Sequence, residues 1–253
     1  MGYPSILEPG DGRRLAYHHL PGAQPTVVFL GGLSSNMNGT KALFLEAHCR
    51  DRGQAFLRLD YQGHGESSGE FLDGGIGPWS DDALAVIQHA CRGPLILIGS
   101  SMGAWIMLRV ARRVQPHRVV ALIGLAAAVD FSEDLLWPGL SATEQSRLLA
   151  DGFIERTSQY ADGPWRIGLA LIEDGRRHLQ LREPIPLRCP VRLLHGLEDQ
   201  DIPWRTSLRL LEMIESSDVR LTLIKGGDHR LSSEANLALL GHCLDALLAT
   251  GVG

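Results

Sequence analysis

The chain has 253 residues and a formal net charge of −5, and 44% of its residues are hydrophobic. A chain of this length fits one domain that buries about three quarters of its unfolded surface, so the core needs neither a disulfide nor a metal. Basic residues are scattered rather than gathered in a stripe, which argues against a nucleic-acid partner. Only Lys41 and Lys225 are lysines, which we attribute to codon bias.

The cysteines, the N-terminal segment and the apolar runs indicate where in the cell the protein is expected. The four cysteines form no C-x-x-C pair, so we expect reduced thiols, no zinc or other metal, and no cofactor. The segment Met1–Leu20 has no secretory apolar region, and Ile6 stands where a myristoylation signal has serine or threonine. No apolar run reaches the roughly 18 residues of a membrane span. We expect a cytoplasmic protein with no integral membrane segment.

Short apolar runs alternate with longer helical patterns along the chain. The segment Tyr3–Leu20 predicts one or two antiparallel edge strands. Further strands are predicted over Thr26–Leu30, Ala55–Leu59, Pro94–Ile98, Val119–Leu125, Val191–His195 and Arg220–Ile224. Helices are predicted over Thr40–Asp51, Ile76–Cys91, Met102–Val114, Trp204–Ile214 and Ser232–Ala249. Continuously apolar runs are typical of parallel strands buried on both faces. The alternation therefore predicts an α/β fold with a mostly parallel sheet flanked by helices.

The regular alternation breaks between about Asp130 and Pro190. Turns containing proline and glycine punctuate short helical patterns there, over Thr143–Ala150 and Trp165–His178. Loops this long in a compact domain usually have a function, such as covering a site. We expect a single α/β domain over residues 1–253, with residues 130–190 as a small helical cap or lid between two core strands.

The pattern G-x-S-x-G occurs at Gly99–Gly103, between a predicted strand and a predicted helix. In this context it predicts a nucleophile elbow, a strained turn that projects the hydroxyl of Ser101 above the sheet. The flanking glycines let the chain approach itself closely, and the helix N-terminus favours developing negative charge. A glycine-rich turn in another doubly wound protein is the structural alternative.

A serine nucleophile needs an acid and then a histidine later in the chain. His229 follows the last predicted strand, from which it can reach Ser101 as the general base. Asp199 follows the preceding strand and would hold the imidazole in the required tautomer. Asp201 is its rival for this role, and His195 is expected to be a structural residue at the end of its strand.

Three further features flank this predicted triad. Glu198 and Asp130 are weaker candidates for the acid. The backbone N–H groups of Met102 and Leu33 are the expected oxyanion hole, worth about 3 kcal/mol each in a transition state. The loop Asp60–Ser67 has the spacing of neither a P-loop nor a dinucleotide fingerprint, so we interpret it as a structural turn beside the site.

A family resemblance extends over most of the chain, from about Val27 to Leu248. Its residues are Met37–Leu43, Gly99–Ser101 with Gly103 and Trp105, Val120–Gly124, Arg192–Gly196, Pro203-Trp204 with Thr206-Ser207, and Asp228–Arg230. With them the chain resembles the α/β-hydrolase superfamily. More narrowly, it resembles the mitochondrial palmitoyl-protein thioesterases among the numbered α/β-hydrolase-domain proteins (member ten) and their bacterial relatives.

The resemblance implies Ser101, Asp199 and His229 as nucleophile, acid and base. It also implies removal of long acyl chains from protein cysteines and cleavage of acyl-glucuronide esters. The chain departs from these relatives at Gln200, which separates Asp199 from Asp201 where the relatives have adjacent acids. It also shows no presequence, so a mitochondrial address is not expected, and residues 130–190 match less well than the core.

We therefore expect a serine hydrolase that cleaves an ester or a thioester, on a small molecule or an acylated cysteine, through an acyl-enzyme. A short-chain carboxylesterase, an acyltransferase or a ligand-binding protein without turnover are the alternatives, because the fold hosts many chemistries. A dehalogenase would need aspartate in place of Ser101. Five apolar residues of the insertion are candidates for the acyl pocket or for the insertion's own core: Phe131, Leu135, Trp137, Phe153 and Trp165.

Overall fold

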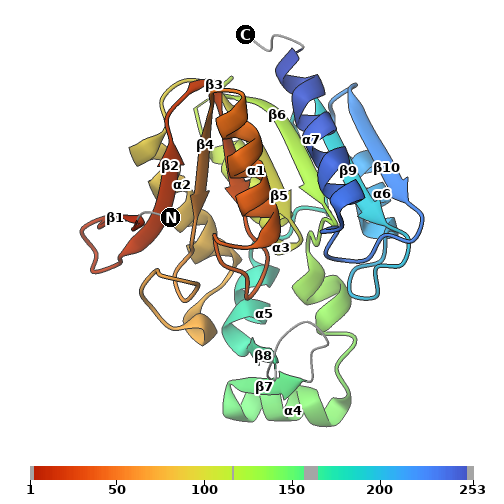
Figure 1. Cartoon of the computed structure of the whole chain (residues 1–253). Helices are drawn as coiled ribbons and strands as arrows, with labels where there is room; N and C mark the ends of the chain where they lie inside the picture. The colour runs from red at the N-terminus through yellow and green to blue at the C-terminus, as the bar shows by residue number, and fades with distance from the viewer. Residues whose placement is uncertain (1–2, 116, 157–164, 250–253) are drawn as a thin grey trace.

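The computed structural model describes residues 3–115, 117–156 and 165–249 (Figure 1). Eight strands form one sheet in the order β1-β2-β4-β3-β5-β6-β9-β10. Their bounds are β1 Ser5–Leu7, β2 Leu15–Leu20, β3 Ala23–Leu30, β4 Gln54–Leu59, β5 Leu95–Ser100, β6 Val119–Leu125, β9 Val191–Gly196 and β10 Val219–Ile224. The strands from β4 to β10 in this order are parallel, while β1 and β2 add antiparallel edge pairings. The predicted α/β fold is confirmed.

Helices cover both faces of the sheet. Their bounds are α1 Thr40–Asp51, α2 Ile76–Ala90, α3 Met102–Arg113, α6 Arg205–Met213 and α7 Glu234–Ala249. Side chains of α2, α3 and α6 pack in one apolar cluster, and those of α1 and α7 pack in another. Along β3, Val28 and Leu30 contribute to the first cluster while Val27 and Phe29 contribute to the second. Because a strand's side chains alternate between faces, a continuously apolar run is what a sheet covered on both sides requires.

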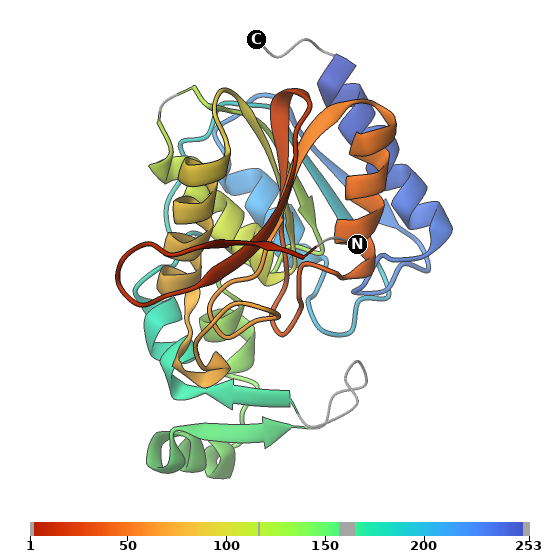
Figure 2. The same ribbon diagram turned by 60° about the vertical axis from the view of Figure 1, so that its left-hand side comes forward.

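The chain between β6 and β9 forms a separate set of elements beyond the end of the sheet at which the parallel strands finish (Figure 1). It comprises a single π-helical turn (η2, Ser132–Leu136), α4 Ala142–Asp151, β7 Phe153–Arg156, β8 Trp165–Gly168 and α5 Leu169–Arg176. β7 and β8 pair antiparallel in a small sheet of their own. In both views α4, β7 and β8 lie farthest from the main sheet (Figure 2).

One sequence expectation for this region is wrong. The segment Trp165–His178 does not form one helix, because its first four residues are β8 and the helix begins only at Leu169. Tryptophan and isoleucine suit a strand, and pairing with β7 satisfies the backbone groups that a helix would otherwise satisfy. The insertion is therefore a mixture of helices and a hairpin rather than purely helical.

None of the helices that the structure describes is both long and apolar enough to cross a bilayer.

Candidate active site

Ser101 occupies a strained turn between β5 and α3. Its backbone has φ 54° and ψ −122°, a conformation that few residues other than glycine adopt. Three backbone hydrogen bonds hold it there: its N–H donates to Leu125 O at 2.8 Å, and its carbonyl accepts from Ala104 N at 3.0 Å and Ala128 N at 3.1 Å. Strain of this kind persists only where neighbouring structure imposes it, and it is common at active sites.

The glycines on either side of Ser101 make this turn possible. A Cβ atom on Gly99 would lie 2.5 Å from the Ala104 Cα, and one on Gly103 would lie 2.1 Å from the Leu30 carbonyl oxygen. Both contacts are with backbone, which cannot move aside easily. The helix α3 can therefore pack against β3 and β5 at this point only without a side chain, which supports the close approach expected of an elbow.

The structure brings Ser101, His229 and Asp199 together in a hydrogen-bonded chain. His229 Nε2 lies 3.0 Å from Ser101 Oγ, and His229 Nδ1 lies 2.8 Å from Asp199 Oδ2. Asp199 and His229 come from the loops that follow β9 and β10, next to each other in the sheet. This arrangement has the geometry in which an imidazole accepts a serine proton while a carboxylate orients the ring.

Asp199 has an environment that keeps its carboxylate charged. Its side chain is fully buried, and burial alone raises its pKa, but hydrogen bonds from His195 and His229 outweigh this and hold the pKa well below its usual value. Its Oδ1 also accepts the backbone N–H groups of Asp201 and Ile202 at 2.9 and 2.8 Å. An ionised carboxylate is what stabilises an imidazolium during proton transfer.

The rival acids are placed differently. Asp201 is exposed, and its backbone N–H supports Asp199. The backbone N–H of Glu198 donates to Gly227 O at 2.9 Å. Asp130 is buried, and its carboxylate accepts the backbone N–H groups of Gln180 and Leu181, both at 2.8 Å. The geometry therefore favours Asp199 as the partner of His229.

The expected oxyanion loop lies beside the nucleophile. A Cβ atom on Gly32 would lie 3.3 Å from the Ser101 Cβ, so the turn after β3 is in van der Waals range of the elbow. Met102 begins α3 directly after Ser101, and Leu33 follows Gly32 in the turn. The oxyanion roles of the Met102 and Leu33 N–H groups remain predictions that this proximity supports.

Residues at the end of β4 hold this turn in place, a role that the sequence reasoning missed. Asp60 Oδ1 accepts Met37 N–H at 2.6 Å, and Arg58 Nη1 donates to Met37 O at 2.9 Å and to Asn38 Oδ1 at 2.7 Å. The Tyr61 hydroxyl donates to Gly31 O at 3.2 Å. Arg58, Asp60 and Tyr61 are each nearly fully buried. A charged pair within an apolar strand end is the sequence signal that could have identified them.

Lys41 supports the loop that carries His229. From α1 its ammonium group donates to the carbonyl oxygen of Arg230 and lies 3.5 Å from the Ser232 hydroxyl. Burial lowers the pKa of Lys41 to about 8, against the attraction of Asp228, which raises it. The ammonium group therefore loses its proton within a few units of neutral pH, unlike an exposed lysine.

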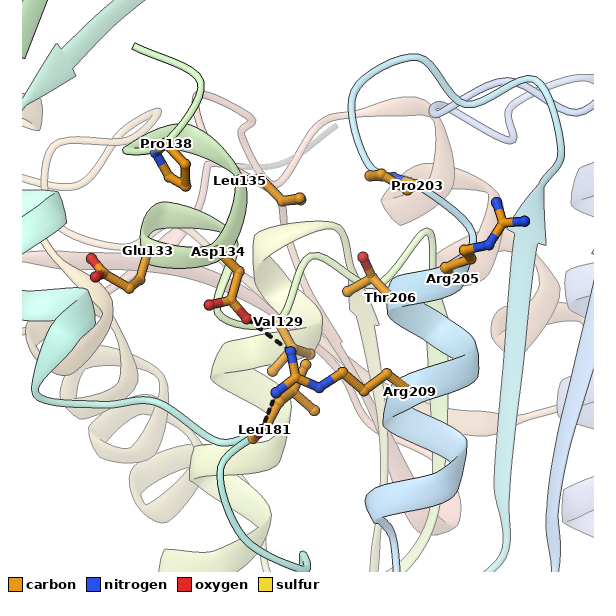
Figure 3. Close-up of a pocket in the computed structure, with 10 residues that line it drawn as sticks. All are labelled: Val129, Glu133, Asp134, Leu135, Pro138, Leu181, Pro203, Arg205, Thr206 and Arg209. Atoms are coloured by element: carbon orange, nitrogen blue, oxygen red, sulfur yellow. Dashed lines mark hydrogen bonds and ion pairs between the residues drawn. The ribbon is translucent and has the colours of Figure 1, made fainter. Parts of the chain in front are cut away.

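A cavity of about 520 Å³ lies between the insertion and α6 (Figure 3). It is lined by apolar Val129, Leu135, Pro138, Leu181 and Pro203, and by polar Glu133, Asp134, Arg205, Thr206 and Arg209. Two of the lining residues are adjacent in sequence to residues that bond the triad. Val129 follows Ala128, whose N–H donates to the Ser101 carbonyl, and Pro203 follows Ile202, whose N–H donates to Asp199 Oδ1.

One side of the cavity is polar. Arg209 donates to Asp134 Oδ2 at 3.1 Å and to the Leu181 carbonyl at 2.5 Å (Figure 3). Arg182 also pairs with Asp134. A cavity with apolar walls and a few fixed polar groups is typical of small-molecule sites.

Of the four apolar candidates of the insertion whose side chains the structure describes, one lines this cavity. Leu135 is one of its lining residues. Phe131 is buried instead, with its ring edge-on to Trp105 at 6.0 Å. Trp137 lies under the Arg176 guanidinium at 4.7 Å, and Phe153 is 37% exposed with Arg166 over its ring. Trp165 lies on β8, and its side chain is outside the described part of the structure.

A group with metal-ligand geometry coincides with the triad. Potential ligand atoms of Asp199, Asp201 and His229 lie within 4.8 Å of one another. His229 and Asp199 already bond each other, so a cation bound there would compete with the arrangement described above. These residues are better explained by acid–base chemistry than by a resident metal.

Comparisons with known proteins identify the family of the chain. Residues 27–240 match the model of a family described as the alpha/beta hydrolase family. The chain is 39% identical over 250 residues to the mitochondrial palmitoyl-protein thioesterase ABHD10 of Bos taurus, covering 96% of this chain and 79% of the relative.

Two solved structures are similar throughout. Mouse alpha/beta hydrolase domain-containing protein 10 superposes with a TM-score of 0.90 at 38% identity, covering 98% of this chain and 99% of that one. A putative hydrolase from Agrobacterium vitis S4 gives a TM-score of 0.91 at 37% identity, covering 97% of each chain. The chain belongs to the α/β-hydrolase family, as both its sequence and its sheet show.

Proposed function

We propose that this chain is a serine hydrolase that cleaves thioesters or esters of carboxylic acids, with S-acylated cysteine as its substrate class. The observation that carries the proposal is the hydrogen-bonded chain from Ser101 through His229 to Asp199 in a family of hydrolases. The palmitoyl-protein thioesterase named among the relatives supports the thioester over other acyl compounds.

The reaction follows from the geometry. Ser101 Oγ attacks the acyl carbon while His229 Nε2 takes its proton, and Asp199 stabilises the resulting imidazolium. The N–H groups of Met102 and Leu33 hold the oxyanion. His229 then returns the proton to the leaving sulfur or oxygen, and a water molecule, activated by the same imidazole, releases the carboxylic acid from Ser101.

Residues 130–190 form the cap of the site in this proposal, and the cavity beside Leu135 receives part of the substrate. The lining residues Val129 and Pro203 directly follow Ala128 and Ile202, whose N–H groups bond Ser101 and Asp199, and this supports the assignment. The polar side formed by Asp134 and Arg209 limits how far a purely hydrocarbon chain can extend in that direction. A bulkier residue at Leu135 would therefore change the preferred acyl length more than the rate of the chemistry.

The test is hydrolysis of matched thioester and ester series, from short to long chains, by the wild type, Ser101→Ala and Leu135→Trp. Loss of the nucleophile should lower kcat about a thousandfold or more on every substrate. Leu135→Trp should shift the preferred chain length while leaving kcat on the best substrate within about threefold.

Other outcomes would point elsewhere. Cleavage of short esters alone would favour a general carboxylesterase, and transfer of the acyl group to an added alcohol in preference to water would favour an acyltransferase. Turnover that survives Ser101→Ala would overturn the mechanism.

The compartment is a separate question, because the Bos taurus relative named above is called mitochondrial. The cytoplasmic location expected from the sequence stays a prediction. Imaging of the tagged full-length protein in its own cells would test it.

A further inference from the structure

Asp199 is in contact with a second imidazole. His195, at the end of β9, has its Nε2 atom 3.1 Å from Asp199 Oδ2. This is the same oxygen that faces His229 Nδ1 at 2.8 Å. The side chains of His195 and Asp199 are both completely shielded from solvent. Two rings, the buried His195 and the partly exposed His229, therefore converge on one buried carboxylate oxygen.

The neighbouring groups assign the tautomer of His195. Its Nε2 also lies 2.9 Å from the Ile202 carbonyl oxygen, and both neighbours of Nε2 are acceptors, so Nε2 carries the proton. Its Nδ1 lies 2.7 Å from the hydroxyl of Ser207, a buried residue in the first turn of α6. A hydroxyl that donates to Nδ1 completes a neutral ring with every polar atom satisfied.

We propose that His195 is a positioning residue for the reaction. The Ser207 hydroxyl fixes its ring so that Nε2 always donates its N–H to Asp199 Oδ2. This hydrogen bond aligns Oδ2 with His229 and limits how strongly the carboxylate stabilises the protonated form of His229. The inference rests on the proposed function, because it requires Ser101, His229 and Asp199 to act as the triad.

The physical argument concerns the charge on Asp199. A carboxylate that shares its charge among several donors interacts less strongly with each of them. His195 and His229 share Oδ2, and two backbone N–H groups occupy Oδ1. Without the donor on His195, more of the negative charge would act on His229 and favour its protonated form. A protonated His229 cannot accept the proton of Ser101.

Other charged groups near His229 stay the same in every variant considered below. A carboxylate oxygen of Asp201 lies within 4.8 Å of His229 and Asp199 ligand atoms. Asp228 precedes His229 and accepts the Leu231 N–H, while Lys41 donates to the carbonyl that follows His229. A difference between variants at position 195 therefore reports on the contact with Asp199.

The experiment measures the pH profile of kcat/KM on an acyl thioester, with thermal unfolding measured in parallel. His195→Leu removes the donor at similar volume, and His195→Gln places an amide N–H near the position of Nε2. We expect His195→Leu to lower kcat about tenfold, as for loss of one hydrogen bond to a charged group. The acidic limb should move to higher pH by roughly half a unit or more, with little change in KM. His195→Gln should restore the limb.

Ser207→Ala provides an independent route if His195→Leu does not fold. Removing the hydroxyl should shift the acidic limb in the same direction but less. Where His195→Leu does fold, Ser207→Ala should add nothing in that background, because the two residues act in series. The low-field proton signal of the His229 Nδ1–H group should also move in each variant that weakens the donor.

Two results would overturn the inference. One is a variant at 195 or 207 that melts at a lower temperature while its acidic limb and low-field signal coincide with the wild type. The other is failure of His195→Gln to restore the limb. Either would make His195 a packing residue only. Turnover in Ser101→Ala, by contrast, would show that the proposed function itself is wrong.

Discussion

The end of the sheet that carries the triad and the 130–190 insertion are held by different kinds of interaction. Around Ser101 and Asp199 the backbone itself supplies most of the bonds, and the Asp199 side chain is fully buried. The insertion exposes Leu149 and Phe153. Many of its side-chain links are partly exposed ion pairs, such as Glu133 with Arg176.

This difference separates the part of the molecule that positions the reacting groups from the part that shapes the substrate cavity. Exposed ion pairs contribute little to stability, typically up to about 1 kcal/mol each. Backbone contacts at the elbow, in contrast, leave no room for even one added methyl group. The part of the molecule that positions reacting atoms is therefore fixed in several ways at once, whereas the part that shapes the substrate cavity can change at low cost.

The largest effect is expected at the elbow itself. Gly103→Ala puts a Cβ atom 2.1 Å from Leu30 O and 2.6 Å from Gly31 O. We expect it to lower the free energy of unfolding by about 3 kcal/mol or more, with loss of activity. Urea denaturation would measure this.

Gly226→Ala is the matched control, since Gly226 has φ 73° but nothing within 4 Å of an added Cβ. It should cost only about 1 kcal/mol from backbone strain. An equal loss of unfolding free energy in Gly103→Ala and Gly226→Ala would mean that the elbow is packed no more tightly than an exposed turn.

The next effect is expected where the insertion joins the core. Asp130 accepts N–H groups from Gln180 and Leu181, and asparagine would present an amide N–H to one of these donors. Asparagine tolerates the positive φ of 58° at this position, so the lost acceptor dominates. We expect Asp130→Asn to lower the free energy of unfolding by about 2 kcal/mol.

Exposed Asp151→Asn is the control for Asp130→Asn and should change stability by less than about 0.5 kcal/mol. Hydrogen exchange at residues 180 and 181 would show whether the junction opens. Unchanged protection there, with unchanged stability, would show that the insertion is held elsewhere.

The smallest effect is expected at Lys41, which acts on the loop of His229 from α1. Its ammonium group loses a proton near pH 8, so the bond to the Arg230 carbonyl weakens as pH rises through 8. We expect wild-type kcat/KM to decline in that window. Lys41→Met should have a kcat/KM roughly fivefold lower at pH 7, and its kcat/KM should not change as the pH rises through 8.

Lys225→Met, which alters the other lysine of the chain, should leave the profile unchanged. A decline above pH 8 that persists in Lys41→Met would assign it to another group.

Much of the core followed from the sequence, and the reasons lie in particular segments. Val27–Leu30 and Leu95–Ile98 are apolar at every position, a pattern typical of strands buried on both faces. The order of Ser101, Asp199 and His229 was readable because each follows a predicted strand, and parallel strands end at one edge. The edge strands β1 and β2 were likewise expected and found.

The insertion was less predictable because its structure depends on pairing at a distance. Nothing within Trp165–Gly168 shows that it pairs with Phe153–Arg156. Aromatic content likewise did not distinguish Phe131, buried against Trp105, from exposed Phe153. At the site, the four-residue spacing of His195 and Asp199 was visible, but not the turn that brings the ring back onto the carboxylate.

The junction at Asp130 has a consequence for how such a protein can change over time. The Asp130 carboxylate ties the start of the insertion to Gln180 and Leu181 in its last third, so these two points of the chain are held together. Lengthening, shortening or exchanging residues between these points would leave the main sheet in place if the bonds from Gly77 N–H to Asp174 and from Trp105 Nε1–H to the His178 carbonyl, which fix α5 to the core, are kept. The same hydrolytic machinery could thus acquire new substrates by replacement of one cassette, and chimeras joined at these two points would be the natural way to transplant selectivity.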